Sequence, residues 1–263
     1  MPQSYHLCID HCTKDDSLKT LAGKRALVTG GSRGIGAAIA VALAENGADV
    51  ALTFQNSADR ANAVVSSIEK LGQRGTAIQA DSADPTAIKR SVEEAVAALG
   101  GLDILVNNAG IALYDTIADF SVSDIDALLA VNVRGPVLTT QAAIPHLGAG
   151  GRVITIGSAG AERIVGAPGT IYYMTKSALQ SFTRGLAQEL GPKDITANLV
   201  QPGSTNTDMN PSNGESSDWQ RSLTPLGRYA EPADIAAAVS FLASPAARHL
   251  TGTIINVDGG LLA

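Results

Sequence analysis

A tyrosine and a lysine lie four residues apart in the second half of the chain, at Tyr172 and Lys176. On a helix this spacing places both side chains on one face, one turn apart. A phenol exchanges protons poorly at neutral pH because its ordinary pKa is about 10, and a neighbouring ammonium lowers that pKa. The rival Tyr173 has Ser177, which carries no charge, four residues further on. The spacing therefore predicts that Tyr172 and Lys176 form an acid/base pair.

A glycine-rich turn at residues 29–36 follows an apolar run and precedes a helical pattern. Glycines let the backbone approach a pyrophosphate, and the free N–H groups of a helix N-terminus bind anions. The spacing is Gly-x-x-x-Gly-x-Gly, and the strand–turn–helix context favours a dinucleotide site over a merely structural tight turn. The residues expected to contact the pyrophosphate are Gly30, Ser32, Gly34, Ile35 and Gly36.

The second expected strand ends without the carboxylate that usually binds the ribose 2′-hydroxyl of NAD. Asn56 and Ser57 follow it, and the first acid is Asp59, inside the next expected helix. Arg33 lies within the glycine-rich turn. A cation and hydrogen-bond donors without an acid favour a 2′-phosphate, so the sequence predicts NADP (NADPH) rather than NAD. The alternative is that Arg33 is a solvated surface charge.

Short apolar runs alternate with helical patterns over most of the chain. This alternation predicts an α/β fold: one doubly wound parallel sheet of seven strands, Rossmann-like, with helices on both faces. Strands are expected at 25–29, 49–54, 76–80, 103–107, 151–156, 196–200 and 252–257. Helices are expected at 35–46, 59–71, 85–99, 124–146 with a kink at Pro136, 172–190 and 232–242.

Residues 23–263 are expected to form a single dinucleotide-binding and catalytic domain. A polar, turn-rich stretch at about 204–226 is the expected substrate loop, because long loops in compact domains usually serve function. Residues 1–22 lack periodicity and are expected to be a flexible N-terminal extension. His6, Cys8, His11 and Cys12 lie in this extension, and their spacing fits no zinc pattern, so no metal site is expected.

The net charge is −6, which argues against nucleic acid or an anionic membrane as the main partner. The chain has two cysteines and so no disulfide framework, which favours a reducing cytoplasm. No apolar stretch reaches the roughly 18 residues that span a bilayer, and the first residues do not read as a secretory signal. These features are typical of a cytoplasmic protein that acts on a small molecule.

With these residues in place, the chain resembles the short-chain dehydrogenase/reductase family over about residues 22–263. Within that family it looks most like NADPH-dependent ketone reductases related to 3-oxoacyl-carrier-protein reductase. The end of its second strand, Asn56-Ser57, is similar to that of the hydroxynaphthalene reductases. The matching motifs are the turn at 29–36, Asn107-Asn108-Ala109-Gly110, Asn132, Ser158, Tyr172-x-x-x-Lys176, Pro202-Gly203 and Val257-Asp258-Gly259-Gly260.

The resemblance implies a role for each catalytic position. Tyr172 would donate a proton to a carbonyl oxygen, Lys176 would lower its pKa and bind the nicotinamide ribose, and Ser158 would stabilise the oxygen. Asn132 would hold a water that relays protons to Lys176. Gly157 replaces a second serine found in many members. Further implied cofactor contacts are Asp81, Ser82, Asn108, Ala109, Gly110, Pro202, Gly203, Thr205 and Thr207, and the family pattern implies a homotetramer.

The first hypothesis is an NADPH-dependent reductase of a small ketone, reversible toward the alcohol. The second is a reductase of 3-oxoacyl thioesters, which needs a basic patch for a carrier protein to which Arg163 and Arg221 could contribute. The third is a non-enzymatic dinucleotide-binding or sensing protein, which has no need of the catalytic set. The substrate pocket is expected to draw on residues 159–170, Tyr114, Met209, Trp219 and Leu223.

Overall fold

The computed structural model describes residues 19–164, 166 and 168–263. Within this part of the chain, seven parallel strands form one sheet in the order β3-β2-β1-β4-β5-β6-β7. This confirms the predicted doubly wound sheet. The strands are β1 (Arg25–Val28), β2 (Asp49–Phe54), β3 (Gly75–Gln79), β4 (Leu102–Asn107), β5 (Leu147–Ile156), β6 (Thr196–Pro202) and β7 (Ile254–Val257).

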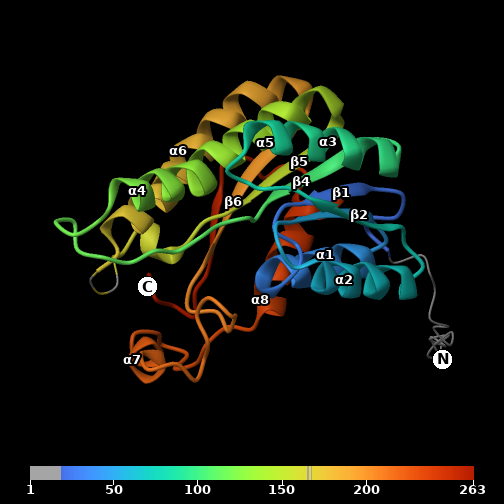
Figure 1. Cartoon of the computed structure of the whole chain (residues 1–263). Helices are drawn as coiled ribbons and strands as arrows, with labels where there is room; N and C mark the ends of the chain where they lie inside the picture. Colours follow the sequence, from blue (N-terminus) through green and yellow to red (C-terminus); the bar gives the residue numbers. More distant parts are fainter. Residues whose placement is uncertain (1–18, 165, 167) are drawn as a thin grey trace, which may run out of the picture.

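Helices cover both faces of the sheet, as predicted. Figure 1 shows α1, α2 and α8 on one side and α3, α4, α5 and α6 on the other, while the short α7 lies away from the sheet. Their bounds are α1 (Gly34–Glu45), α2 (Ala58–Lys70), α3 (Pro85–Leu99), α4 (Val122–Leu129), α5 (Gly135–Ala143), α6 (Thr170–Leu190), α7 (Ser217–Ser222) and α8 (Pro232–Ala243).

The core divides into two clusters because successive strand residues point to opposite faces of the sheet. Val28 and Ile154 pack in the cluster on the α1 and α8 side. Their neighbours Leu27 and Val153 pack in the cluster on the α3 and α6 side. Strands buried on both faces explain the continuous apolar runs in the sequence.

Helix α3 shows how local sequence sets an element. The carboxylate of Asp84 accepts from the N–H of Thr86, and Pro85 occupies the first turn. Gly100 ends the helix in the left-handed region at φ 78°. A polar N-cap, an early proline and a final glycine are the ordinary boundary signals of a helix.

The long helix predicted over 124–146 is interrupted before its proline. A π-helical turn, Ala130–Arg134, separates α4 from α5, and Pro136 lies in the first turn of α5. Proline has no N–H to donate to the carbonyl of Asn132, so the hydrogen-bond ladder cannot continue regularly there. The widened turn carries Asn132, and such turns are frequent at functional sites.

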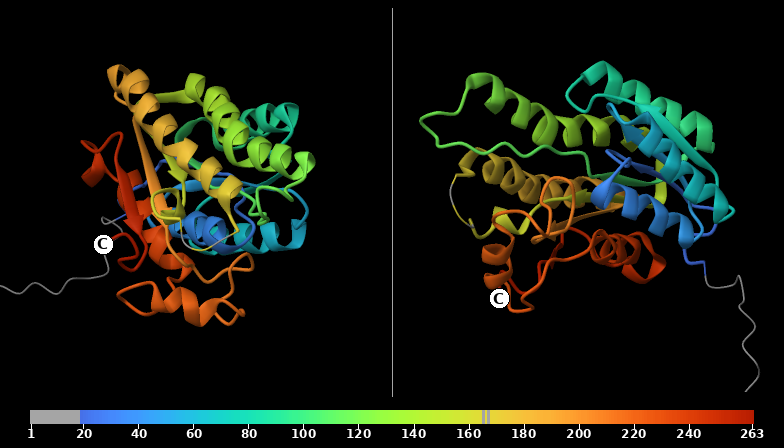
Figure 2. Two further views of the ribbon diagram at one scale, coloured as in Figure 1. Left: turned by 90° about the vertical axis from the view of Figure 1, so that its left-hand side faces the viewer. Right: turned by 60° about the horizontal axis from the view of Figure 1, so that its bottom comes forward.

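The predicted substrate loop leaves β6 and returns to α8. It contains α7 and projects below the sheet in Figure 1 and in the right-hand view of Figure 2.

At the amino-terminal end of the described residues, Leu21 is 1% exposed and its N–H donates to the carbonyl of Asn46 at 2.8 Å. The folded domain therefore includes the last residues of the expected extension. His6, Cys8, His11 and Cys12 lie outside the described residues. Among those described, no helix combines the length and apolarity needed to cross a membrane.

Candidate active site

A cavity of about 900 Å³ opens at the carboxyl ends of the strands. In doubly wound sheets, ligands bind at this end, at the point between β1 and β4 where the strand order reverses. The cavity brings together all the predicted site residues except Asn132: Gly30, Ser32, Arg33, Gly34, Ile35, Gly36, Asn56, Ser57, Asp81, Ser82, Asn108, Ala109, Gly110, Ser158, Tyr172, Lys176, Pro202, Gly203, Thr205 and Thr207.

The turn between β1 and α1 needs its glycines for close backbone approach. Gly30 adopts φ 65°, and a Cβ there would lie 3.0 Å from the Cα of Ala109. A Cβ on Gly36 would collide with the carbonyl oxygen of Gly30 and the amide of Asn108. The α1 N-terminus has no side-chain cap, and its first turn holds no acid. Its backbone N–H groups and dipole thus remain available to an anion, which fits a pyrophosphate.

The side chain of Asn108 stabilises this turn through hydrogen bonds. Its Nδ2 donates to the carbonyl oxygens of Thr29 at 2.9 Å and Gly30 at 3.1 Å. The hydroxyl of Thr29 in turn accepts from the backbone N–H groups of Asn108 and Ala109. These bonds fasten the end of β4 to the glycine-rich turn, so Asn108 shapes the cavity wall that was predicted to contact a cofactor.

The far end of the cavity is lined by Arg33, the cation predicted for a 2′-phosphate, and a second arginine lies beside it, outside the cavity lining. Arg33 lies at the start of α1, and Ser57 precedes α2 with no side-chain cap bond. Arg60, which the sequence analysis did not single out, projects from the first turn of α2. Both arginines reach the carboxylate of Asp208 in the substrate loop. The signal that could have found Arg60 is its place three residues after Ser57.

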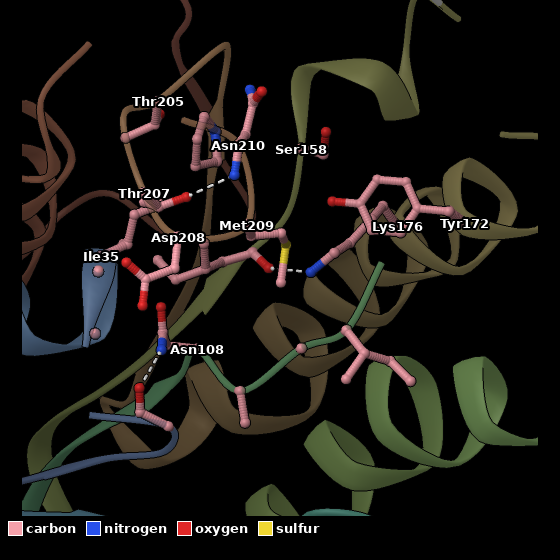
Figure 3. Close-up of a pocket in the computed structure, with 18 of the residues that line it drawn as sticks. Ile35, Asn108, Ser158, Tyr172, Lys176, Thr205, Thr207, Asp208, Met209 and Asn210 are labelled. Atoms are coloured by element: carbon pink, nitrogen blue, oxygen red, sulfur yellow. Dashed lines mark hydrogen bonds between the residues drawn. The ribbon is translucent and has the colours of Figure 1, made fainter. Parts of the chain in front are cut away.

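Tyr172 lies near the N-terminus of α6, and Ser158 lies just after β5 (Figure 3). Burial is the largest influence on the pKa of Tyr172 and raises it; the nearby Tyr114 raises this pKa further, and the side chain of Ser158 lowers it. The pKa shift is therefore upward overall, opposite to the lowering expected from Lys176. At neutral pH this phenol keeps its proton.

Lys176 is only 6% exposed, and its Nζ donates to the carbonyl of Ile156 at 3.2 Å. Burial lowers the pKa of this amine to about 8. A Cβ on Gly110 would lie 3.3 Å from both the Nζ of Lys176 and the Oδ1 of Asn132. The lysine, the loop after β4 and the π turn thus meet at one point.

Asn132 is 1% exposed and does not line the cavity. Its Oδ1 accepts from the N–H of Ile111 at 2.9 Å, and its Nδ2 donates to the carbonyl of Ile111 and to the hydroxyl of Thr175. The amide therefore links the loop after β4 to α6, one residue before Lys176. Its position supports a positioning role for the side chain.

The neighbouring Tyr173 is held differently from Tyr172. Its ring fits between two glycines: a Cβ on Gly160 would collide with it, and one on Gly169 would lie 2.6 Å from its Cε2. The rings of Tyr172 and Tyr173 also pack edge to face, with centroids 5.4 Å apart. Packing explains why this tyrosine is present, and the spacing argument for Tyr172 does not apply to it.

The open side of the cavity has an aromatic and apolar wall. Tyr114, with its ring centroid 5.5 Å from that of Tyr172, lines it together with Met209, Trp219 and Leu223, as the sequence analysis expected. Tyr114 is 54% exposed and Trp219 47% exposed. Of the 159–170 segment, the described Ala159, Gly160, Gly166 and Pro168 also line the cavity.

A doubly wound sheet, an uncapped helix after a glycine-rich turn and a buried lysine one helical turn from a tyrosine define a dinucleotide-binding oxidoreductase. The sequence model of a family described as enoyl-(acyl carrier protein) reductase matches residues 30–262. A versicolorin reductase of Emericella nidulans is 42% identical over 254 residues, 91% of this chain and 96% of that protein. The cyclic-di-GMP-binding biofilm dispersal mediator protein of Escherichia coli K12 is 40% identical, over 90% and 96%.

Solved structures agree with this. A short-chain dehydrogenase of Burkholderia cenocepacia J2315 in complex with NADP superposes with a TM-score of 0.92 at 53% identity, over 93% of this chain and 100% of that one. A blue fluorescent protein from a metagenomic library in complex with NADPH gives 0.91 at 48% identity, with the same coverage. The chain belongs to the short-chain dehydrogenase/reductase family and is an oxidoreductase acting on CH–OH and C=O groups.

Proposed function

We propose that this protein is an NADPH-dependent reductase of a small ketone. The observation that carries the proposal is that Tyr172, Ser158 and Lys176 face the same cavity as the uncapped N-terminus of α1. NADPH supplies the hydride when it is bound. The residues of this chain hold the cofactor, orient the carbonyl and provide the proton.

The cofactor assignment follows from charge. Arg33 lines the cavity, Arg60 lies beside it through their shared partner Asp208, and no carboxylate stands directly after β2. Two arginines match the geometry and charge of a 2′-phosphate. The neighbours solved with NADP and NADPH support the same choice. We therefore assign NADP(H) to this chain, with NAD as the weaker alternative.

The proton donor in this proposal is Tyr172. A raised pKa keeps the phenol protonated at neutral pH, which is the form needed to protonate a carbonyl oxygen as it gains a hydride. Ser158, whose side chain lowers the pKa of that phenol, would stabilise charge on the same oxygen. Lys176 would add a positive charge below a pH of about 8. In reverse, alcohol oxidation needs the phenolate and so a higher pH.

The wall made by Tyr114, Met209 and Trp219 favours an apolar or aromatic ketone. Relatives named versicolorin reductase and elsinochrome reductase agree with this class. The alternative of a 3-oxoacyl thioester reductase has little support, because the two arginines expected to bind a carrier protein, Arg163 and Arg221, have other partners. Arg163 donates to the carbonyl of Leu261, and Arg221 pairs with Asp218 and stacks over Tyr229.

The deciding experiment is a panel of ketones with NADPH and with NADH, followed by absorbance of the reduced cofactor. Tyr172→Phe is expected to lower kcat by at least about 100-fold, the size of a general-acid contribution, and to leave NADPH affinity nearly unchanged. Tyr173→Phe is the matched control and should keep most of the activity. Full activity in Tyr172→Phe would refute the acid assignment.

The panel also separates enzymes from sensors. A sensing protein would bind NADPH and turn over no ketone, and the name of the Escherichia coli relative makes this a fair alternative.

We further propose a cytoplasmic homotetramer. Exposed apolar residues on α4, α5 and α6, among them Val122, Val137 and Met174, support association. Light scattering of the purified chain measures the oligomeric state.

A further inference from the structure

One carboxylate in the substrate loop, that of Asp208, is shared by Arg33, which lines the dinucleotide end of the cavity, and by Arg60, which lies beside it. An Oδ2 of Asp208 lies 2.6 Å from the Nη1 of Arg60 and 3.4 Å from the Nη1 of Arg33. Arg33 is the residue before α1, and Arg60 lies in the first turn of α2. Three segments far apart in the sequence therefore meet in one ion cluster, and Figure 3 shows Asp208 facing the cavity.

The cluster is open to solvent. The three side chains are 56–60% exposed, and an exposed ion pair contributes only weakly to stability. A phosphate group carries more charge than a carboxylate and offers three acceptor oxygens. Asp208 therefore holds the arginines loosely enough for a phosphate to replace it.

We infer that Asp208 is an internal anion that competes with the cofactor's 2′-phosphate for Arg33 and Arg60. The inference rests on the NADPH assignment above and goes beyond it. Competition lowers the affinity for every 2′-phosphorylated ligand by the fraction of time that Asp208 occupies the arginines. It leaves ligands without that phosphate unaffected, so Asp208 reduces the preference for NADPH over NADH.

The same carboxylate is connected to the substrate wall. Thr207 and Asn210 exchange backbone hydrogen bonds around Asp208. The amide of Asn210 then exchanges two bonds with the amide of Gln220 on α7, at 2.9 and 3.0 Å. Gln220 is the neighbour of Trp219. Release of Asp208 from the arginines is thereby transmitted to the tryptophan that lines the substrate side of the cavity.

Asp208→Asn tests the competition directly. The variant keeps the side-chain size and removes the charge, so titration calorimetry should show NADPH bound about 2–5-fold more tightly, the range expected for losing a weak exposed ion pair. NADH affinity should not change. Asp218→Asn is the matched control, because Asp218 lies in the same loop and pairs with Arg221 instead of Arg33 or Arg60. It should bind both cofactors as the wild type does.

The tryptophan tests the connection. Trp219 is the only tryptophan in the chain, so its fluorescence reports on the loop. Adenosine 2′,5′-bisphosphate should shift its emission in the wild type, whereas AMP should not. In Asp208→Asn the unliganded protein should already show the shifted emission, and the bisphosphate should add little. Unaltered emission throughout would refute the connection.

The outcomes separate the inference from the function on which it rests. If wild type binds NADPH no better than NADH, the cofactor assignment itself fails. If it prefers NADPH and Asp208→Asn binds NADPH equally well or more weakly, the function stands and the competition is refuted. Weaker binding would mean that Asp208 orients the arginines for the phosphate. Arg60→Gln should weaken NADPH selectively, and Arg60→Lys should restore part of the loss.

Discussion

Replacing the buried lysine with methionine should make the protein more stable while removing its activity. Lys176 is 6% exposed, and burial lowers the pKa of its amine from 10.5 to about 8. By linkage, that drop corresponds to about 3 kcal/mol of unfolding free energy lost below pH 8. Methionine keeps the length and helix propensity of lysine without the charge. Losing the hydrogen bond to Ile156 offsets about 1 kcal/mol, so Lys176→Met should gain about 2 kcal/mol at pH 7.

The pH dependence identifies the cause. Between pH 8 and 10.5 the unfolded lysine binds more protons than the folded one, so wild-type stability gains from rising pH over this interval. The advantage of Lys176→Met should therefore shrink to near zero by pH 10. Urea unfolding of both proteins at pH 7 and pH 10, at one protein concentration, measures the difference.

The control for this measurement is Lys89→Met, at a lysine whose side chain is 74% exposed. It should change stability by no more than about 0.5 kcal/mol at either pH. A Lys176→Met protein that is less stable than wild type at pH 7, or whose advantage is the same at both pH values, would contradict the burial argument.

Two further predictions concern the glycine-rich turn and the amino-terminal ends of the central strands β1 and β4. Gly36→Ala should lower the free energy of unfolding by about 2 kcal/mol, because the new methyl group meets the carbonyl of Gly30. It should also abolish the rise in melting temperature that NADPH causes. An undiminished rise would refute the argument that the backbone must approach closely here. Asp103 accepts bonds from Arg25 that, with the charge of Arg25, hold its pKa below the ordinary value despite burial. Asp103→Asn should therefore lower the free energy of unfolding by about 1 kcal/mol at pH 7. Urea unfolding at a series of acid pH values should show that the variant loses less stability below pH 4 than the wild type does. An equal loss in both proteins would assign it to other carboxylates.

Local spacing was enough to predict the glycine-rich turn and the Tyr172–Lys176 pair, whereas Ser158, Asn108 and most other lining residues were predicted from the family resemblance. The glycine-rich turn and the Tyr172–Lys176 pair are each set within one strand–turn–helix unit or one helical turn, so their geometry follows from short-range rules. The parallel, doubly wound character of the sheet followed from the alternation of strands and helices, whereas the strand order came from the structure. Short-range rules also place helix boundaries well where caps are present, as at α3.

Long-range features could not be predicted in the same way. The ion cluster of Arg33, Arg60 and Asp208 joins residues up to 175 positions apart. The π turn depends on how α4 and α5 pack as well as on Pro136. The direction of the Tyr172 pKa shift depends on burial, which a charge-based argument from Lys176 leaves out. Each error came from a property of the packed chain.

Burial also explains how the site divides its work. Inside, the environment of Tyr172 and Lys176 favours the neutral form of both groups, because desolvation raises the pKa of the phenol and lowers that of the amine. The free-energy cost of burying the amine is offset by other interactions of the fold, since Lys176 has only the carbonyl of Ile156 as a hydrogen-bond partner in the described structure. At the far end, Arg33 and Asp208 remain in water, where salt screens them. Proton transfer therefore depends on two largely desolvated groups at the cavity wall, while the choice of cofactor depends on exposed charges that can exchange partners.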